Sequence, residues 1–167
     1  MTSGVTPADA PRERIPGQVL TFVLSTEHYG VDILRVQEIR GWSSITKIPH
    51  APSHVLGVLN LRGSIVPIVD LRMKFCLERA EYTPTTVTIV LSISTASGVR
   101  NVGVVVDAVS DVKDVNRAEV KPAPELMGYS ATEHILGLLS LDGQMTMLLD
   151  IDRLIGGDTG ALPALAA

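Results

Sequence analysis

Hydrophobic positions in this chain come in short runs that are interrupted by glycine, proline or polar residues. Many of the runs are rich in valine and isoleucine, which suit a pleated and half-buried surface. Such runs predict β-strands, and a glycine between two of them, such as Gly63 or Gly143, predicts a hairpin turn. We therefore expect strands over residues 19–24, 29–36, 58–61, 64–70, 85–93 and 101–106.

Three segments depart from this strand pattern. Asp70 and Asp150 each end an apolar run and are followed by apolar residues at spacings of three to four. An aspartate at such a place caps a helix, so a short helix is expected after each. The polar stretch 114–134 contains Pro122 and Pro124 and is predicted to be a loop.

The chain also repeats itself. Residues 57–72 match residues 137–152 at an offset of 80, with five identities in sixteen positions. Residues 22–25 match 89–92 at an offset of 67, and residues 30–39 match 103–112 at an offset of 73. The offsets grow along the chain, as insertions in the second copy would require. The sequence therefore predicts two similar modules.

The repeat sets the expected domain organisation. Short strands that end in a turn of helix suggest a small barrel, and two copies suggest paired barrels packed on one another. We expect a mobile arm over 1–17, two barrel subdomains over roughly 18–83 and 84–155, and a flexible tail over 156–167.

Composition narrows the class of protein. Hydrophobic residues make up 46% of the chain and aromatic residues only 4%, so the core must consist mainly of valine, isoleucine and leucine. This composition favours a mostly-β fold. The net charge is −4 and no block of five like charges occurs, which argues against nucleic-acid binding.

The number of cysteines and the length of the apolar stretches predict the cellular setting. Cys76 is the single cysteine, which excludes an internal disulfide and favours a reducing cytoplasm. We expect Cys76 to be a small buried hydrophobic residue and not a nucleophile. No apolar stretch reaches the roughly 18 to 20 residues that cross a bilayer, so we expect no direct membrane insertion.

Residues that could support catalysis are sparse. The chain has no nucleophile elbow, phosphate-binding loop or dinucleotide fingerprint in the right context. His50 and His54 have the spacing of a metal pair, but Pro52 lies between them and no acidic cluster completes a site. Asp150 and Asp152 fit helix capping and surface charge better than a paired-carboxylate site. We expect no enzyme activity, no cofactor and no metal.

Charge distinguishes the two copies of the repeat. Arg62 stands at the first turn where Asp142 stands at the second. Arg62 is either a solvated turn residue or an arginine that pairs with Glu38 from a neighbouring strand and reaches across an interface. Strict alternation puts Val36 on the face opposite Ile39, so at least one of them should point outward. An exposed apolar edge next to charge is typical of a docking surface.

Residues 29–39, Ile48–Pro49 and 57–72 closely resemble the CheW-like domain family of bacterial chemotaxis coupling proteins. The run Asn-Leu-Arg-Gly-x-Ile-x-Pro-Ile-x-Asp-Leu is that family's signature, and the resemblance extends over residues 18–155. It implies two intertwined SH3-like five-stranded β-barrel subdomains with short helices. It also implies a scaffold that holds a histidine kinase to the cytoplasmic tips of transmembrane chemoreceptors.

The resemblance also implies two binding surfaces. The receptor-facing surface, near the groove between the subdomains, carries over onto Val36, Glu38, Ile39, Gly57, Arg62 and Gly63. The kinase's regulatory domain has the same fold in this family and associates pseudo-symmetrically, through barrel edges. In the second subdomain we place that contact on Val104, Val105 and Val106.

Two alternatives stay open at this point. A small-ligand-binding double barrel would use the groove as a discrete apolar pocket. A coupler of a chemosensory pathway other than swimming would keep the scaffold and change its partners. The sequence does not distinguish a swimming pathway from another one.

Overall fold

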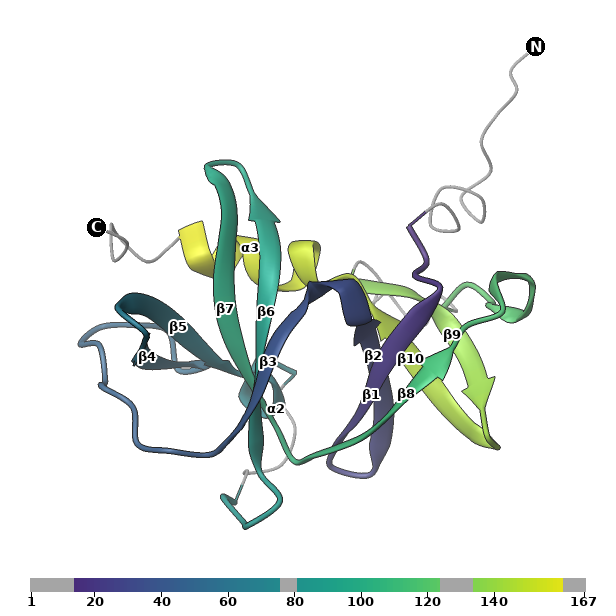
Figure 1. The fold of residues 1–167 in the computed structure, drawn as a ribbon, viewed down its shortest axis with the longest axis horizontal. Helices are drawn as coiled ribbons and strands as arrows, with labels where there is room; N and C mark the ends of the chain where they lie inside the picture. The colour runs from purple at the N-terminus through teal and green to yellow at the C-terminus, as the bar shows by residue number, and fades with distance from the viewer. Residues whose placement is uncertain (1–13, 76–80, 124–133, 161–167) are drawn as a thin grey trace.

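The computed structural model describes residues 14–75, 81–123 and 134–160, with the backbone alone for 156–160. The described part is mostly β, as expected (Figure 1). The strands are β1 (Gln18–Leu24), β2 (Glu27–Asp32), β3 (Val36–Gly41), β4 (Val55–Leu61), β5 (Ser64–Asp70), β6 (Val87–Thr95), β7 (Gly98–Val106), β8 (Ala108–Asp114), β9 (Ile135–Leu141) and β10 (Gln144–Leu149). The helices are α2 (Leu71–Lys74) and α3 (Ile151–Gly160), with single 3₁₀ turns η1 (Ile33–Arg35) and η2 (Arg117–Glu119).

The strands form two five-stranded sheets that exchange hairpins. Sheet A has the order β8-β1-β2-β10-β9, and sheet B has the order β3-β6-β7-β5-β4. The first sequence copy places β1 and β2 in sheet A and β3 to β5 in sheet B; the second places β6 and β7 in sheet B and β8 to β10 in sheet A. The subdomains are intertwined, but the expected division at 83/84 separates the sequence copies and not the folded units, because it falls inside sheet B.

Parallel pairing joins the two copies within each sheet. Strand β10 pairs in parallel with β2, and β5 pairs in parallel with β7. The remaining ladders are antiparallel and join strands of one copy, apart from β1–β8 and β3–β6, which also cross between copies. Each sheet is therefore completed only when both halves of the chain are present.

Each sheet closes into a barrel through the chain that follows its edge strand. Beyond β3, Thr46 pairs with Val58 of β4, and beyond β8, Lys121 pairs with Leu138 of β9. At both closures a glycine lets the backbones approach: a Cβ at Gly57 would overlap the Thr46 carbonyl, and a Cβ at Gly137 would overlap the Val120 side chain. These are repeat-equivalent positions, and the closures explain why both keep glycine.

Three apolar clusters fill the part of the molecule that the structure describes. One lies inside sheet A (Ile15, Val19, Val115, Val120, Leu139, Leu148), and another lies inside sheet B (Leu61, Val66, Ile68, Val90, Val105). The largest lies between the sheets and takes the alternate residues of the same strands, such as Leu20, Ile89, Val104 and Leu149. Because central strands are buried on both faces, their sequences read as continuous apolar runs.

The helix predictions are confirmed, and the ends of the folded part extend further than expected. Asp70 accepts a hydrogen bond from the backbone N–H of Arg72, and Asp150 accepts one from Arg153. Residues 14–17 are not part of a mobile arm: Ile15 is buried in sheet A, and the Gly17 carbonyl accepts from the Val115 N–H. Helix α3 continues to Gly160, into the expected tail.

Two further expectations fall partly or wholly on residues outside the described part. The predicted loop contains η2, and its residues 124–133 lie outside the described part, as does Cys76. Within the described part, no helix is both long and apolar enough to span a membrane.

Candidate functional site

Both sheets carry a β-bulge at the same place in their edge strands. In β3, Val36 pairs with Leu91 while Glu38 pairs with Val90, so Gln37 is the extra residue. In β8, Val109 pairs with Phe22 while Val112 pairs with Leu20, so two residues of β8 oppose Thr21 alone. The Thr21 hydroxyl fills this second bulge, where it donates to the Asp111 carbonyl and accepts from the Asp111 N–H.

The bulges change which residues share a face. Ile39 pairs with Ile89, which like Leu91 points into the core between the sheets. Residues directly opposite one another in a ladder point to the same side of the sheet. Val36 and Ile39 therefore share one face, and our expectation of opposite faces was wrong because strict alternation ignores the extra residue.

The second edge strand repeats this arrangement. Val109 and Val112 lie opposite Phe22 and Leu20, which also belong to the core between the sheets. We call Val36, Ile39, Val109 and Val112 the aliphatic face. Val36 and Val109 pack on the core, while Ile39 is 46% exposed and Val112 42% exposed.

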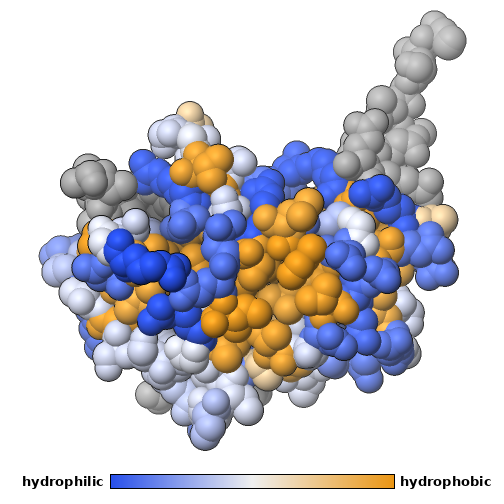
Figure 2. Space-filling view, in the orientation of Figure 1, coloured by the Kyte–Doolittle hydropathy of each residue, from blue (hydrophilic) through white to orange (hydrophobic). Residues whose placement is uncertain are grey.

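The aliphatic face belongs to a larger apolar area. Hydrophobic side chains gather at the centre of the molecule in Figure 2, over the region that lies between β3 on one side and β1 and β8 on the other in Figure 1. Leu34 of η1, 83% exposed, adds to the apolar surface beside β3. Sequence reasoning found Val36 and Ile39 and missed Val109 and Val112, although the offset of 73 already aligned the two pairs.

The first charged flank consists of Arg40, Glu38 and Arg62. Glu38 accepts from Arg40 at 2.9 Å through one carboxylate oxygen and from Arg62 at 2.6 Å through the other. The hydrogen bond from Arg40, and then that from Arg62, hold the pKa of Glu38 below its ordinary value. The predicted pair of Glu38 and Arg62 is confirmed, but the strands are not neighbours: β3 and β4 are the two edges of sheet B, and the pair spans the barrel opening between them.

The turn that carries Arg62 has an unusual backbone. Arg62 has φ 52° and Gly63 has φ 88°, and the Asn60 side chain accepts from the Gly63 N–H at 3.0 Å. Two consecutive left-handed residues make a tight hairpin turn, which confirms the predicted role of Gly63. The turn holds Arg62 outward, with its side chain 80% exposed.

The second charged flank consists of Asp111, Lys113 and Asp142. Lys113 of edge strand β8 pairs with Asp142, at the turn beside the other edge strand, β9, and lies 3.5 Å from Asp111. The hydrogen bond to Asp142 raises the pKa of Lys113. Asp142 has φ 50° and Gly143 has φ 80°, nearly the values of their first-copy equivalents. The two flanks therefore occupy equivalent places. Their strand residues keep the same charges, and the turn residue changes from the basic Arg62 to the acidic Asp142.

The remaining predicted site residues lie elsewhere. Gly57 is buried at the closure of sheet B. Val104, Val105 and Val106 are fully buried in β7, which lies between β6 and β5 at the centre of sheet B. The expectation that they form a barrel edge for the kinase is wrong, because their side chains fill the cores on both faces of the sheet.

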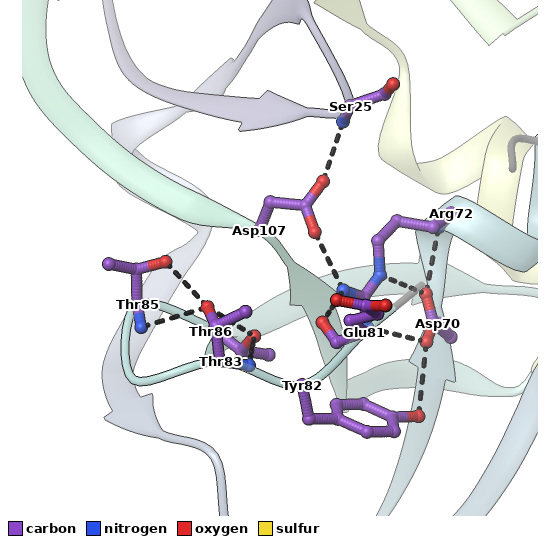
Figure 3. Close-up of polar contacts among 9 residues, drawn as sticks. All are labelled: Ser25, Asp70, Arg72, Glu81, Tyr82, Thr83, Thr85, Thr86 and Asp107. Carbon is purple, nitrogen blue, oxygen red and sulfur yellow. Dashed lines mark hydrogen bonds and ion pairs between the residues drawn. The ribbon is translucent and has the colours of Figure 1, made fainter. Parts of the chain in front are cut away.

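Two ion pairs fix the chain where it crosses between the sheets. Asp107 lies between β7 and β8; its carboxylate accepts from Arg72 of α2 at 2.7 Å and from the Ser25 N–H of the β1–β2 turn at 2.6 Å (Figure 3). Arg35 lies in the other crossing, η1, and forks to Asp152 of α3 at 2.7 and 2.8 Å. In this second pair the crossing segment carries the arginine and the helix carries the aspartate, which is the reverse of the first pair.

The Arg72 crossing is a buried network. Burial disfavours the charged guanidinium, but its hydrogen bonds to Asp70 and Asp107 outweigh that effect and raise the pKa of Arg72. The Tyr82 ring lies beside the guanidinium, 5.2 Å from ring centroid to Cζ, and stacks on Trp42 at 4.2 Å. These ionic groups hold the crossing in place, with one guanidinium shared between two carboxylates.

Hollows and metal-ligating groups bear on the alternative functions. Two hollows beside η1, about 210 and 430 Å³ in volume, share Arg14 and Asp32 in their walls. In the first, Arg14 is paired with Asp150 and Arg35 with Asp152, so these four charged groups already compensate one another. Among residues 14–75, 81–123 and 134–160, no three His, Cys, Asp or Glu side chains are placed to hold a metal ion.

Comparison with known proteins agrees with this arrangement. The family model for the CheW-like domain matches residues 18–158. Chemotaxis protein CheW of Klebsiella aerogenes is 45% identical over 150 residues, covering 90% of this chain and 88% of that protein. Protein FrzA of Myxococcus xanthus is 28% identical, covering 87% of this chain and 89% of that protein.

A solved structure shows the same fold. The scaffolding protein TtCheW from Thermoanaerobacter tengcongensis superposes with a TM-score of 0.74 at 30% identity, covering 84% of this chain and 93% of that one. The family match spans both sheets, the aliphatic face and both crossings, and therefore nearly all of the described structure. This chain belongs to the CheW-like domain family.

Proposed function

We propose that this protein is a non-enzymatic adaptor that couples transmembrane chemoreceptors to a chemotaxis histidine kinase. The observation that carries the proposal is the aliphatic face, which two bulged edge strands hold at the surface between charged flanks. Natural edge strands usually avoid exposing apolar side chains in this way. An apolar centre with a polar rim is the usual anatomy of a protein-binding surface.

Membership of the family supports a scaffold role. The related Klebsiella protein is named for chemotaxis, and the structural neighbour is called a scaffolding protein. Members of this family are non-enzymatic, and the chain is one of them. The contacts that matter are therefore interface contacts.

The receptor contact is proposed for Val36, Glu38, Ile39, Arg62 and Gly63, which gather around the aliphatic face and the first charged flank. Gly57 acts indirectly, since it lets β4 close the sheet that positions Arg62. The partner is the cytoplasmic tip of a methyl-accepting receptor, and the protein is cytoplasmic and recruited to receptor clusters.

The kinase contact is proposed for a separate surface. The regulatory domain of the kinase has the same double-barrel fold in this family, so it can associate as a continuation of the barrels. Separate surfaces allow one molecule to hold both partners, which raises the kinase's effective concentration at the receptor. Ligand state can then bias kinase conformation through interface free energies.

Co-sedimentation tests this function. Receptor-containing membranes are mixed with the cognate kinase, with and without this protein, and kinase in the pellet and its autophosphorylation are measured. The proposal predicts that the wild-type protein brings kinase into the pellet and raises its activity, and that Arg62→Asp does so less. If the wild-type protein neither pellets with receptor nor recruits kinase, the coupling role is wrong.

A second candidate keeps the adaptor and changes the pathway. FrzA, which is similar to this chain, is not named for chemotaxis. The same surfaces would then serve receptors of another chemosensory system. Deleting the gene and scoring swimming in soft agar against surface spreading separates the two pathways.

A further inference from the structure

The two charged flanks are related by the sequence repeat, and their net charges are opposite because the turn residue is Arg62 in the first flank and Asp142 in the second. An offset of 73 aligns Glu38 with Asp111 and Arg40 with Lys113, and an offset of 80 aligns Arg62 with Asp142. In the first flank a carboxylate joins two arginines. In the second flank a lysine joins two aspartates. The first flank is therefore net positive and the second net negative.

The outer charges of both flanks are available to a partner. The Arg62 side chain is 80% exposed, and those of Asp142 and Asp111 are 72% and 66% exposed. The inner groups, Glu38 and Lys113, each satisfy two opposite charges and are less exposed. Each flank thus presents its majority charge outward.

We infer that the aliphatic face docks an amphipathic helix in one orientation, set by acidic side chains toward the first flank and basic side chains toward the second. The inference rests on the proposed receptor contact and adds β8 and its flank to that surface. Opposite fields on two sides of an apolar surface favour a partner with complementary charges and disfavour the reversed placement.

The edge strands themselves favour a helix over an added strand. A partner strand needs a continuous row of free N–H and C=O groups along an edge. The bulges at Gln37 and opposite Thr21 interrupt that row in both β3 and β8. A helix needs only apolar side chains on one face, which Val36, Ile39, Val109 and Val112 can accept.

The test neutralises the second flank without disturbing its backbone. Asp111→Asn with Asp142→Asn keeps the side-chain shapes, and asparagine tolerates the left-handed backbone at position 142. The pair changes the flank from net negative to net positive. The matched control is Asp114→Asn with Glu119→Gln, which removes the same charge from exposed residues outside both flanks. Both double variants therefore have the same net charge.

The probe is a helical fragment of the cognate receptor's cytoplasmic tip, titrated against each variant at low and high salt. We expect the flank variant to bind at least about fivefold more weakly than the control variant at low salt, and the difference to shrink at high salt. Circular dichroism confirms that both variants remain folded.

Two results would overturn the inference, and they differ in what else they reject. If the flank variant binds like its control while Val36→Asp abolishes binding, the second flank has no part in docking and the receptor contact stands. If wild type, flank variant and Val36→Asp all bind alike, the proposed receptor contact fails together with the orientation.

Discussion

At the scale of single residues, the most consequential group is Arg72. Its side chain is 2% exposed and joins Asp70, Asp107 and the Glu81 carbonyl. A buried ion pair adds little net stability compared with an apolar replacement of both partners, but removing one partner leaves the other charged and buried. Arg72 therefore fixes the conformation of the crossing between the sheets and adds little net free energy of unfolding.

Replacing Arg72 with Met should lower the free energy of unfolding by about 3 to 5 kcal/mol, since Asp70 would stay buried without its cation. Arg153→Met is the control: Arg153 is largely exposed, and losing its pair with Asp150 should cost less than about 1 kcal/mol. Urea unfolding measures both. Equal effects would show that the Arg72 network is not a structural constraint.

The other crossing makes stability depend on pH. Burial favours the protonated form of Asp152, but its hydrogen bond with Arg35 and that from the Ser94 N–H outweigh burial and lower its pKa below the ordinary 3.8. A carboxylate whose folded pKa is lowered contributes stability above its unfolded pKa and loses it as pH falls through the folded pKa.

Asp152→Asn should therefore lower the melting temperature at neutral pH, and the difference from wild type should shrink as pH falls below 3.8. Thermal melts across that acid range test the sign. A difference that stays constant with pH would mean that Asp152 ionisation does not stabilise this crossing.

At the scale of elements, the equivalent edge strands β3 and β8 have equivalent geometry. The bulges of β3 and β8 place two aliphatic residues of each strand on one face. Sequence reasoning assigned only the first strand to the docking surface, because the family's distinctive motif lies in the first copy. The structure adds Val109 and Val112 of β8 to the aliphatic face.

Val109→Asp should weaken receptor association by about tenfold or more, as Val36→Asp should, since each places a charge in an apolar contact. Val99→Asp is the control, because Val99 is exposed at the start of β7 and is not part of the aliphatic face. Pulldown with receptor membranes measures all three. Loss with Val36→Asp alone would confine the contact to β3.

The closures of the two barrels depend on glycine in the same way. Gly57→Ala should cost about 2 to 3 kcal/mol, because the new Cβ overlaps the Thr46 carbonyl and the backbone must shift. Gly41→Ala, where a Cβ would meet nothing within 4 Å, should be close to neutral. Chemical unfolding compares them, and a neutral Gly57→Ala would reject the closure role.

At the scale of the whole molecule, hairpin exchange makes the two barrels one cooperative unit. Each barrel contains strands of both copies, and the largest core lies between them. Unfolding followed by Trp42 fluorescence, which reports on sheet B, should therefore coincide with unfolding followed by far-ultraviolet circular dichroism. Two separate transitions would show that the sheets are stable independently.

Much of this fold is predictable from local sequence. Apolar runs, glycine turns and the aspartate caps at Asp70 and Asp150 are local signals, and they predicted both helix starts and many of the strands. The single strand expected over 29–36 was wrong, because the structure divides this run into the end of β2, the turn η1 and the start of β3. The hairpin exchange was not predictable in detail, because the repeat reports which segments are alike and says nothing about which strands pair. The burial of Val104 to Val106 follows from that pairing.

The site was partly predictable for the same reason. The pair of Glu38 and Arg62 follows from charge and turn chemistry, and the structure confirms it. Val36 and Ile39 share a face because of a bulge. An apolar/polar pattern does not reveal that one extra residue has been inserted into a strand. Ile15 was assigned to the arm because it lies among prolines and polar residues. A single apolar residue makes no pattern, so the sequence did not show that this side chain is buried inside sheet A.

The measurement that tests the central claim most directly is kinase autophosphorylation in receptor membranes with wild type, Val36→Asp or Val99→Asp. The account predicts that wild type and Val99→Asp raise the rate alike, whereas Val36→Asp does not, although it still binds soluble kinase. Equal stimulation by all three folded proteins would contradict a coupling role for the aliphatic face.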